Sequence, residues 1–216
     1  MKKALIFYGG WPGHTPKETS RVFAGMLKNE GFALTITDNM QIFDSCDNIL
    51  EFDLLVPNIT MGDISNTQCE NISKAVAAGA GMAGCHGGMC DAFRNSSLWQ
   101  FITGAQWVAH PGNSDIEYEV ELLRDDELTF GIDNFKIKTE QYYLHIDPAV
   151  KVHATTTFPV SDGEHASNGI VKMPVIFTKK WGKGKIYYNS LGHTYEIFSL
   201  PQPRELMRRG FLWASR

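Results

Sequence analysis

The sequence has few cysteines, no long apolar run and no excess of positive charge. Four cysteines in 216 residues are too few for a disulfide framework, and their spacing fits no familiar zinc motif. No apolar run approaches the roughly 18 to 20 residues that span a bilayer. A formal net charge of -4 gives no broad attraction to nucleic acid or to an anionic membrane. These absences predict a reduced, cytoplasmic protein without nucleic-acid or membrane partners.

The composition is that of an ordinary globular chain, with 43% hydrophobic and 20% charged residues. A chain of this length can bury a substantial core without disulfides or a structural metal. No repeat, low-complexity stretch or linker divides it. Residues 1–216 are therefore predicted to form a single domain.

The first half of the chain alternates between strand and helix patterns. Thr15-Pro16-Lys17-Glu18 has the composition of a capping box at a helix start, and Ser65 or Asn66 starts a second helix that ends at Gly79. A third helix is expected over about 91–102. The predicted strands are 4–8, 34–37, 53–57 and 81–85. Continuous apolar runs such as residues 4–8 are typical of parallel strands that are covered on both faces.

The second half contains more strands than helices. Residues 116–122 alternate strictly between polar and apolar, which indicates a half-exposed strand. Further strands are predicted at 135–139, 150–156, 171–177 and 185–189. The sequence therefore predicts an α/β protein with a mostly parallel central sheet and extra β-strands in its second half.

A sharp turn follows the fourth predicted strand, in Gly84-Cys85-His86-Gly87-Gly88. A strand-to-helix elbow needs small residues around its apex, commonly a glycine two positions before it and another two positions after it. Centring the turn on His86 places glycine at both required positions, whereas centring it on Cys85 places Ala83 at one of them. His86 is therefore the predicted apex, and Cys85 is expected to point back into the sheet as a buried thiol.

Other polar residues follow predicted strands, where ligands bind in open α/β sheets. They lie in Gly9-Gly10-Trp11-Pro12-Gly13-His14, in His110-Pro111-Gly112 after Trp107, in Glu140-Gln141-Tyr142-Tyr143 and in Gly192-His193-Thr194. Each motif taken alone is also compatible with a solvated or core side chain. His145, His153 and His165 have no supporting context and are interpreted as surface or structural residues.

Taken together, these motifs resemble the trehalose-utilization (ThuA-like) family, a branch of the class I glutamine amidotransferase-like superfamily. The matching stretches are the elbow, residues 104–111, residues 139–142 and residues 181–193, and the last is the most specific. The resemblance covers nearly the whole chain. Two features depart from the family pattern: Thr139 stands where the family often has Asp, and Cys85 directly precedes His86.

The resemblance implies a flavodoxin-like three-layer sandwich with a pocket at the carboxyl ends of the strands. It also implies that His86 occupies the position of the nucleophilic Cys of true amidotransferases. By this likeness the pocket would be lined by His86, His110, Glu140, Tyr142 and His193, with His14 nearby. The name and associations of the family imply metabolism of a disaccharide or an oxidised sugar.

These observations favour an enzyme that acts on a small carbohydrate or its keto derivative. Glu140 would serve as general acid or base, His86 and His110 would polarise groups or shuttle protons, and Tyr142 would orient the substrate. Residues predicted to contact the substrate are Gly10, Trp11, His14, Cys85, Gly87 and Trp107. A divalent metal of the zinc type is a candidate cofactor, with His86, His110 and His193 as its candidate ligands.

Two other functions stay open at this point. One is a cysteine-dependent amidotransferase or amidohydrolase that uses Cys85, and the other is a sugar-binding module without catalysis. Trp11, Trp107 and Trp181 are candidates either for the pocket or for an interface in a homo-oligomer.

Overall fold

The computed structural model describes residues 1–123 and 126–216. Its strands are β1 Lys3–Gly10, β2 Ala33–Thr37, β3 Leu54–Thr60, β4 Gly81–Cys85, β5 Ala105–Ala109, β6 Glu117–Leu122, β7 Phe135–Lys138, β8 Tyr143–Ile146, β9 Lys151–Phe158, β10 Val171–Trp181 and β11 Gly184–Asn189. Its α-helices are α1 Pro16–Asn29, α2 Asn66–Ala78, α3 His86–Cys90, α4 Ser97–Thr103 and α5 Pro201–Ala214. Short 3-10 helices join several of these elements, among them Pro12–His14 and Tyr195–Ser199.

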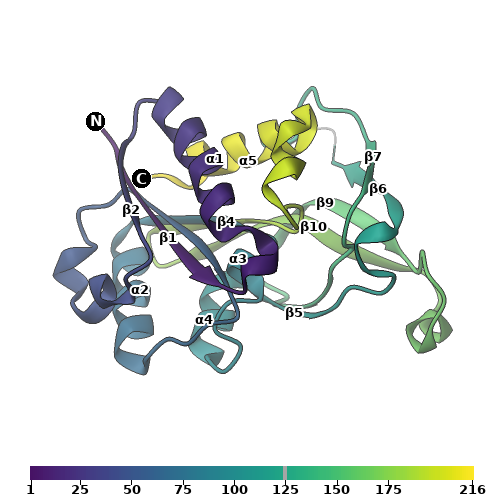
Figure 1. Cartoon of the computed structure of the whole chain (residues 1–216), viewed down its shortest axis with the longest axis horizontal. Helices are drawn as coiled ribbons and strands as arrows, with labels where there is room; N and C mark the ends of the chain where they lie inside the picture. Colours follow the sequence, from purple (N-terminus) through teal and green to yellow (C-terminus); the bar gives the residue numbers. More distant parts are fainter. Residues whose placement is uncertain (124–125) are drawn as a thin grey trace.

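A large mixed sheet forms the centre of the molecule (Figure 1). Its strand order is β2-β1-β3-β4-β11-β10-β9-β6-β7, and β5 pairs with β8 in a separate small sheet. The first five strands in this order, β2, β1, β3, β4 and β11, pair in parallel. The remaining strands, β10, β9, β6 and β7, extend the sheet with antiparallel pairs. The predicted α/β class, with a parallel centre and extra strands from the second half, is therefore confirmed.

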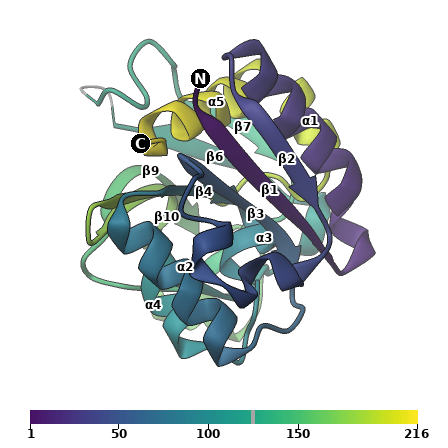
Figure 2. The same ribbon diagram turned by 90° about the vertical axis from the view of Figure 1, so that its left-hand side faces the viewer.

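Helices cover both faces of the parallel region and make a three-layer sandwich. Alternate residues of β1 enter two different cores, because successive side chains of a strand point to opposite faces. Leu5 and Phe7 pack in the core beneath α2 and α4, whereas Ala4 and Ile6 pack in the core beneath α1 and α5. Figures 1 and 2 show these helix pairs on opposite sides of the sheet. None of the helices in the described part of the chain has the length and apolar character needed to cross a bilayer.

Two local predictions about helix starts are wrong. The helix expected over 91–102 is divided into α3, which begins at His86, and α4, which begins at Ser97. Between them the backbone of Phe93 is left-handed (φ 50°), and the Ser96 side chain caps α4 by accepting a hydrogen bond from the Trp99 amide. Thr15 does not form a capping box: its backbone is left-handed (φ 46°), and its side chain makes no capping hydrogen bond.

Three elements were not predicted from the sequence. β5 and β8 pair with each other in a two-stranded sheet, and their short segments carry no regular alternation of apolar and polar residues. α5 packs along β11 and β4, and it buries Leu206, Met207 and Phe211. The apolar residues of α5 recur at helical spacing, so the sequence does contain a signal for this helix.

Candidate functional site

Polar side chains from distant parts of the sequence meet at the carboxyl ends of the parallel strands. His14 follows β1, His86 follows β4 and His193 follows β11. Because β1, β3, β4 and β11 run in parallel, the loops that follow them lie at the same edge of the sheet. His110 follows β5, and Glu140 lies between β7 and β8.

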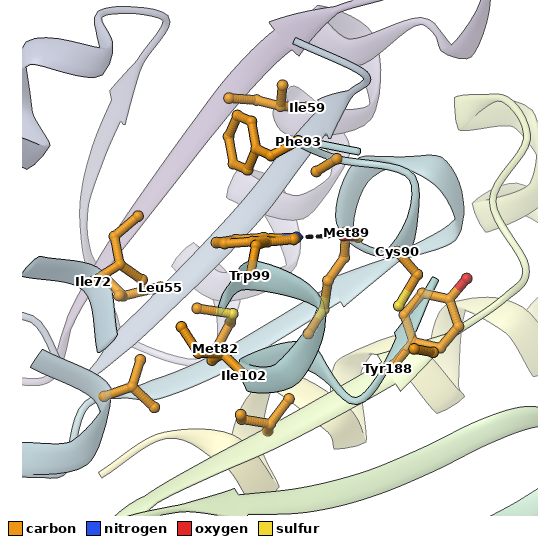
Figure 3. Close-up of a cluster of buried hydrophobic side chains, with 14 of the residues drawn as sticks. Leu55, Ile59, Ile72, Met82, Met89, Cys90, Phe93, Trp99, Ile102 and Tyr188 are labelled. Carbon is orange, nitrogen blue, oxygen red and sulfur yellow. Dashed lines mark hydrogen bonds between the residues drawn. The ribbon is translucent and has the colours of Figure 1, made fainter. Parts of the chain in front are cut away.

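The elbow after β4 has His86 at its apex. The backbone of His86 is left-handed (φ 45°), a conformation that costs a non-glycine residue of the order of 1 kcal/mol or more. The hydroxyl of Tyr188 donates to the His86 carbonyl over 3.3 Å, and the buried Trp99 indole donates to the Met89 carbonyl over 2.9 Å (Figure 3). The apolar core below the elbow therefore fixes its backbone. The His86 side chain is only 1% exposed, so it forms the floor of the site.

The Glu140 carboxylate lies at the centre of four imidazole rings. Its Oε2 atom is 3.3 Å from His86 Nε2 and 3.9 Å from His14 Nε2. Its Oε1 atom is 3.3 Å from His193 Nδ1 and 3.8 Å from His110 Nε2. The structure thus brings together all four histidines and the glutamate that the sequence singled out.

Neighbouring residues hold Glu140 and His14 in these positions. The Tyr118 hydroxyl donates to the Glu140 backbone carbonyl over 3.0 Å. Beside it, the Gln141 amide donates to Thr156 Oγ1 over 2.7 Å, which anchors the segment to β9. His14 Nδ1 lies 2.7 Å from Thr60 Oγ1, so the Nε2 atom of the same ring is directed at the carboxylate. Thr60 was not predicted as a site residue, although its place at the end of β3 is a usable signal.

Burial determines the charge states in this cluster. It lowers the pKa of His14 to about 3 and that of His86 to about 4, so both rings are neutral at pH 7. Burial alone would raise the pKa of Glu140, but its interactions with His193 and His86 outweigh this effect and lower that pKa. The site therefore holds a buried carboxylate anion beside the neutral rings of His14 and His86.

Several polar atoms of the cluster have no hydrogen-bond partner among the described residues. They are both ring nitrogens of His86, Oε2 of Glu140 and Nδ1 of His193. Buried polar atoms are nearly always paired, so these atoms are available as ligand atoms for a group that binds at this point. One ligand atom from each of His14, His86, Glu140 and His193 lies within 4.8 Å of the others. This group contains His14 in place of the predicted candidate His110.

A cavity of about 280 Å³ opens beside the cluster. His110, Glu140 and Tyr142 border it, and the Tyr142 ring lies against the His86 ring with 3.8 Å between centroids. Other residues that border the cavity are Trp11, Met61, Trp107 and Asn113. Pockets for small molecules begin at roughly 300 Å³. The space is therefore suited to a ligand of about one sugar ring.

Asp91 and Arg94 also border the cavity, and neither was predicted as a site residue. Both oxygens of the buried Asp91 accept hydrogen bonds from Arg94, at 2.5 Å from Nε and 2.8 Å from Nη2. Opposite charges three residues apart are common on helix surfaces, which is why this pair carried no special signal in the sequence.

Three predicted contact residues have other positions. Cys85 is buried with Leu191 and Phe198 in the core beneath α1 and α5, away from the residues that border the cavity. Gly10 packs against the backbone of Thr60, and Gly87 packs against the His14 ring. Both glycines therefore shape the site by close approach.

The Cys85 thiol is expected to be unreactive in the folded protein. Burial raises its pKa, and only an accessible thiolate reacts rapidly. Iodoacetamide at neutral pH, followed by peptide mapping, should modify the half-buried Cys46 first and should label Cys85 only after denaturation. Rapid stoichiometric labelling of Cys85 would instead support a thiol-dependent reaction.

The chain has recognisable relatives in sequence and in structure. The sequence model of the trehalose utilisation (ThuA) family matches residues 3–214. A search of curated proteins finds no significant match. A putative ThuA-like protein of Parabacteroides merdae is 19% identical, with 99% of this chain and 89% of that chain covered and a TM-score of 0.77. A putative ThuA-like protein of Bacteroides uniformis is 15% identical, with 99% and 91% covered and a TM-score of 0.76.

A third solved structure, a cytoplasmic protein of Salmonella typhimurium LT2, is 12% identical. The alignment covers 99% of this chain and 100% of that chain, with a TM-score of 0.71. At these identities the likeness to the three structures shows the fold, which agrees with the flavodoxin-like sandwich expected from the sequence.

Proposed function

This chain belongs to the trehalose utilisation (ThuA) family, and we propose that it is an enzyme of carbohydrate metabolism that binds a divalent metal ion of the zinc type. The proposed ligands are His14, His86, Glu140 and His193. The reaction would take place on a sugar, or a keto derivative of one, in the adjoining cavity.

The observation that carries this proposal is the set of unpartnered ligand atoms around a buried carboxylate. Desolvating a buried carboxylate is costly, and a bound cation would offset this cost in addition to the imidazole contacts. Imidazole nitrogen and carboxylate oxygen are ligands that zinc prefers, and catalytic zinc sites commonly combine them. The contact between His14 Nδ1 and Thr60 Oγ1 is of the kind that orients a metal-binding imidazole.

Each residue has a distinct part in the proposed reaction. A bound ion would supply Lewis acidity toward a carbonyl or hydroxyl oxygen of the sugar. Since Glu140 would be occupied as a ligand, the proton transfer first assigned to it passes to His110. His110 Nε2 lies 3.8 Å from the carboxylate, and its side chain is 28% exposed beside the cavity. Tyr142 packs against His86 and gives the sugar a flat wall.

The ion should bind with one equivalent per chain and should stabilise the protein. Zinc at a hundredfold excess over its dissociation constant would add about 2.7 kcal/mol to the free energy of unfolding. Metal analysis of the purified protein and thermal melts with and without zinc measure both effects. His14→Ala and His193→Ala should abolish the shift, and His145→Ala, on the exposed side of β8, is the matched control.

Two results would contradict the metal part of the proposal. One is a metal content below roughly a tenth of an equivalent after zinc is added and excess removed, since a preformed site retains its ion. The other is a thermal shift that all three variants share. Turnover of unmodified and 3-keto disaccharides by the same preparation then tests the catalytic part, and binding without turnover would instead indicate a sugar-binding module.

A further inference from the structure

Arg94 has hydrogen-bonding capacity that the fold itself does not use. A guanidinium group offers two forked pairs of N–H donors, one at Nε and Nη2 and one across Nη1 and Nη2. The first fork is occupied by the two oxygens of Asp91. The second fork has no hydrogen-bond partner among the residues that the structure describes. The side chain is 40% exposed and borders the cavity next to the histidine cluster.

The guanidinium is held in place from two directions. Asp91 is only 3% exposed, so its carboxylate is a fixed partner. The Trp107 ring lies beneath the guanidinium, with Cζ 4.8 Å from the ring centroid. Asp91 and the Trp107 ring thus hold the guanidinium rigid, and a rigid donor fork loses little entropy when it binds.

We propose that Arg94 is the residue that recognises the sugar, by donating through its free fork to two adjacent hydroxyl oxygens of a neutral ring. This inference rests on the proposed function, because it names how the substrate of that same cavity is held. Arg94 lies at the cavity wall and is not one of the four proposed ion ligands. It would therefore affect affinity and specificity for the sugar without holding the ion.

The charge around Arg94 favours neutral hydroxyls over a carboxylate. A forked donor pair fits either a carboxylate or two neighbouring oxygens. Asp91 already neutralises the guanidinium, and a second carboxylate on the same group would lie close to the first. Like charges at such a distance repel each other, and burial of Asp91 strengthens the repulsion. A vicinal diol takes the same two hydrogen bonds without this cost.

The test compares two probes on zinc-loaded protein by isothermal titration calorimetry. Trehalose supplies neutral vicinal hydroxyls, and glucuronate supplies a carboxylate on a similar ring. Arg94→Lys keeps the positive charge for Asp91 but loses the fork. We expect it to weaken trehalose binding roughly ten- to a hundredfold, while zinc stoichiometry stays at the wild-type value. Arg21→Lys, on the exposed side of α1, is the matched control and should bind trehalose like the wild type.

Each other outcome contradicts a defined part of the inference. If wild-type protein binds trehalose and Arg94→Lys binds it equally well, the role of Arg94 is wrong and the proposed function stands. If glucuronate binds more tightly than trehalose and depends on Arg94, the ligand is an anion and the neutral diol is wrong. If neither sugar binds to protein that does hold zinc, both this inference and the carbohydrate substrate fail. Zinc binding by Arg94→Lys shows that the variant is folded. Trp107→Phe leaves a smaller aromatic ring under the guanidinium, so it should give a smaller loss in the same direction.

Discussion

Glu140→Gln is expected to remove most of the activity without unfolding the protein. The amide has the shape of the carboxylate but carries no charge, so the proposed ion would lose its anionic ligand. A bound ion supplies several kcal/mol of transition-state stabilisation, so its loss should lower kcat/KM by about 10²- to 10⁴-fold. Zinc stoichiometry should fall in parallel. Turnover of the best sugar from the screen and metal analysis measure the two losses.

The stability of the same variant should also fall. Although burial alone would raise it, the pKa of Glu140 is lowered by its interactions with His193 and His86, so the charged carboxylate contributes to the stability of the fold at neutral pH. Glutamine keeps the shape of the side chain but loses this contribution, so the melting temperature should decrease while the protein stays folded. Glu119→Gln, on the exposed face of β6, is the control and should alter neither activity nor zinc binding. Full activity and full zinc content in Glu140→Gln would refute the role assigned to the carboxylate.

Gly87→Ala is expected to damage the site by moving a neighbouring side chain. A Cβ atom at position 87 would lie 2.7 Å from Cε1 and Nδ1 of His14 and 2.9 Å from the Thr60 hydroxyl. One of these groups must shift, and the hydrogen bond between them would break. We expect a loss of about 1 to 3 kcal/mol in the free energy of unfolding and a loss of about ten- to a hundredfold in zinc affinity. Urea unfolding and zinc titration measure the two effects.

Gly25→Ala is the matched control for that change. Gly25 lies inside α1, and a Cβ atom there would meet nothing within 4 Å. Alanine is the better helix former, so this variant should gain about 0.5 to 1 kcal/mol of stability and keep its zinc affinity. If the loss at Gly87 acts through His14, adding Gly87→Ala to His14→Ala should reduce zinc affinity little further. Full additivity of the two losses would contradict this explanation.

The parallel half of the fold could be predicted because its signals are local. The strand at residues 4–8 is apolar throughout and is covered on both faces in the structure. The cap at Ser65 and the stop at Gly79 bound α2 as expected, because each forms hydrogen bonds within its own turn. The apex of the elbow followed from glycine spacing alone, since only small neighbours allow the sharp turn at His86.

The remaining features depend on contacts between distant segments. The break between α3 and α4 is set by pairing of residues 61 and 91–93 across two loops, which a single-segment pattern does not contain. Likewise, β5 is a strand only because β8 lies beside it. The role of Asp91 and Arg94 became visible only when the structure placed both beside Trp107. His14 replaced His110 in the ligand group for the same reason, since distance in space is not encoded in the motif of either residue.

The contribution of widely separated loops to one site has a consequence for how the protein folds. The proposed ligands span residues 14–193, so no shorter contiguous fragment contains the whole set. They converge only after β1, β3, β4 and β11 have paired, and such non-local parallel pairings form slowly. Ion capture would therefore be a late event on the folding pathway. Metal content would then report, in a single measurement, whether the two halves of the chain have assembled correctly.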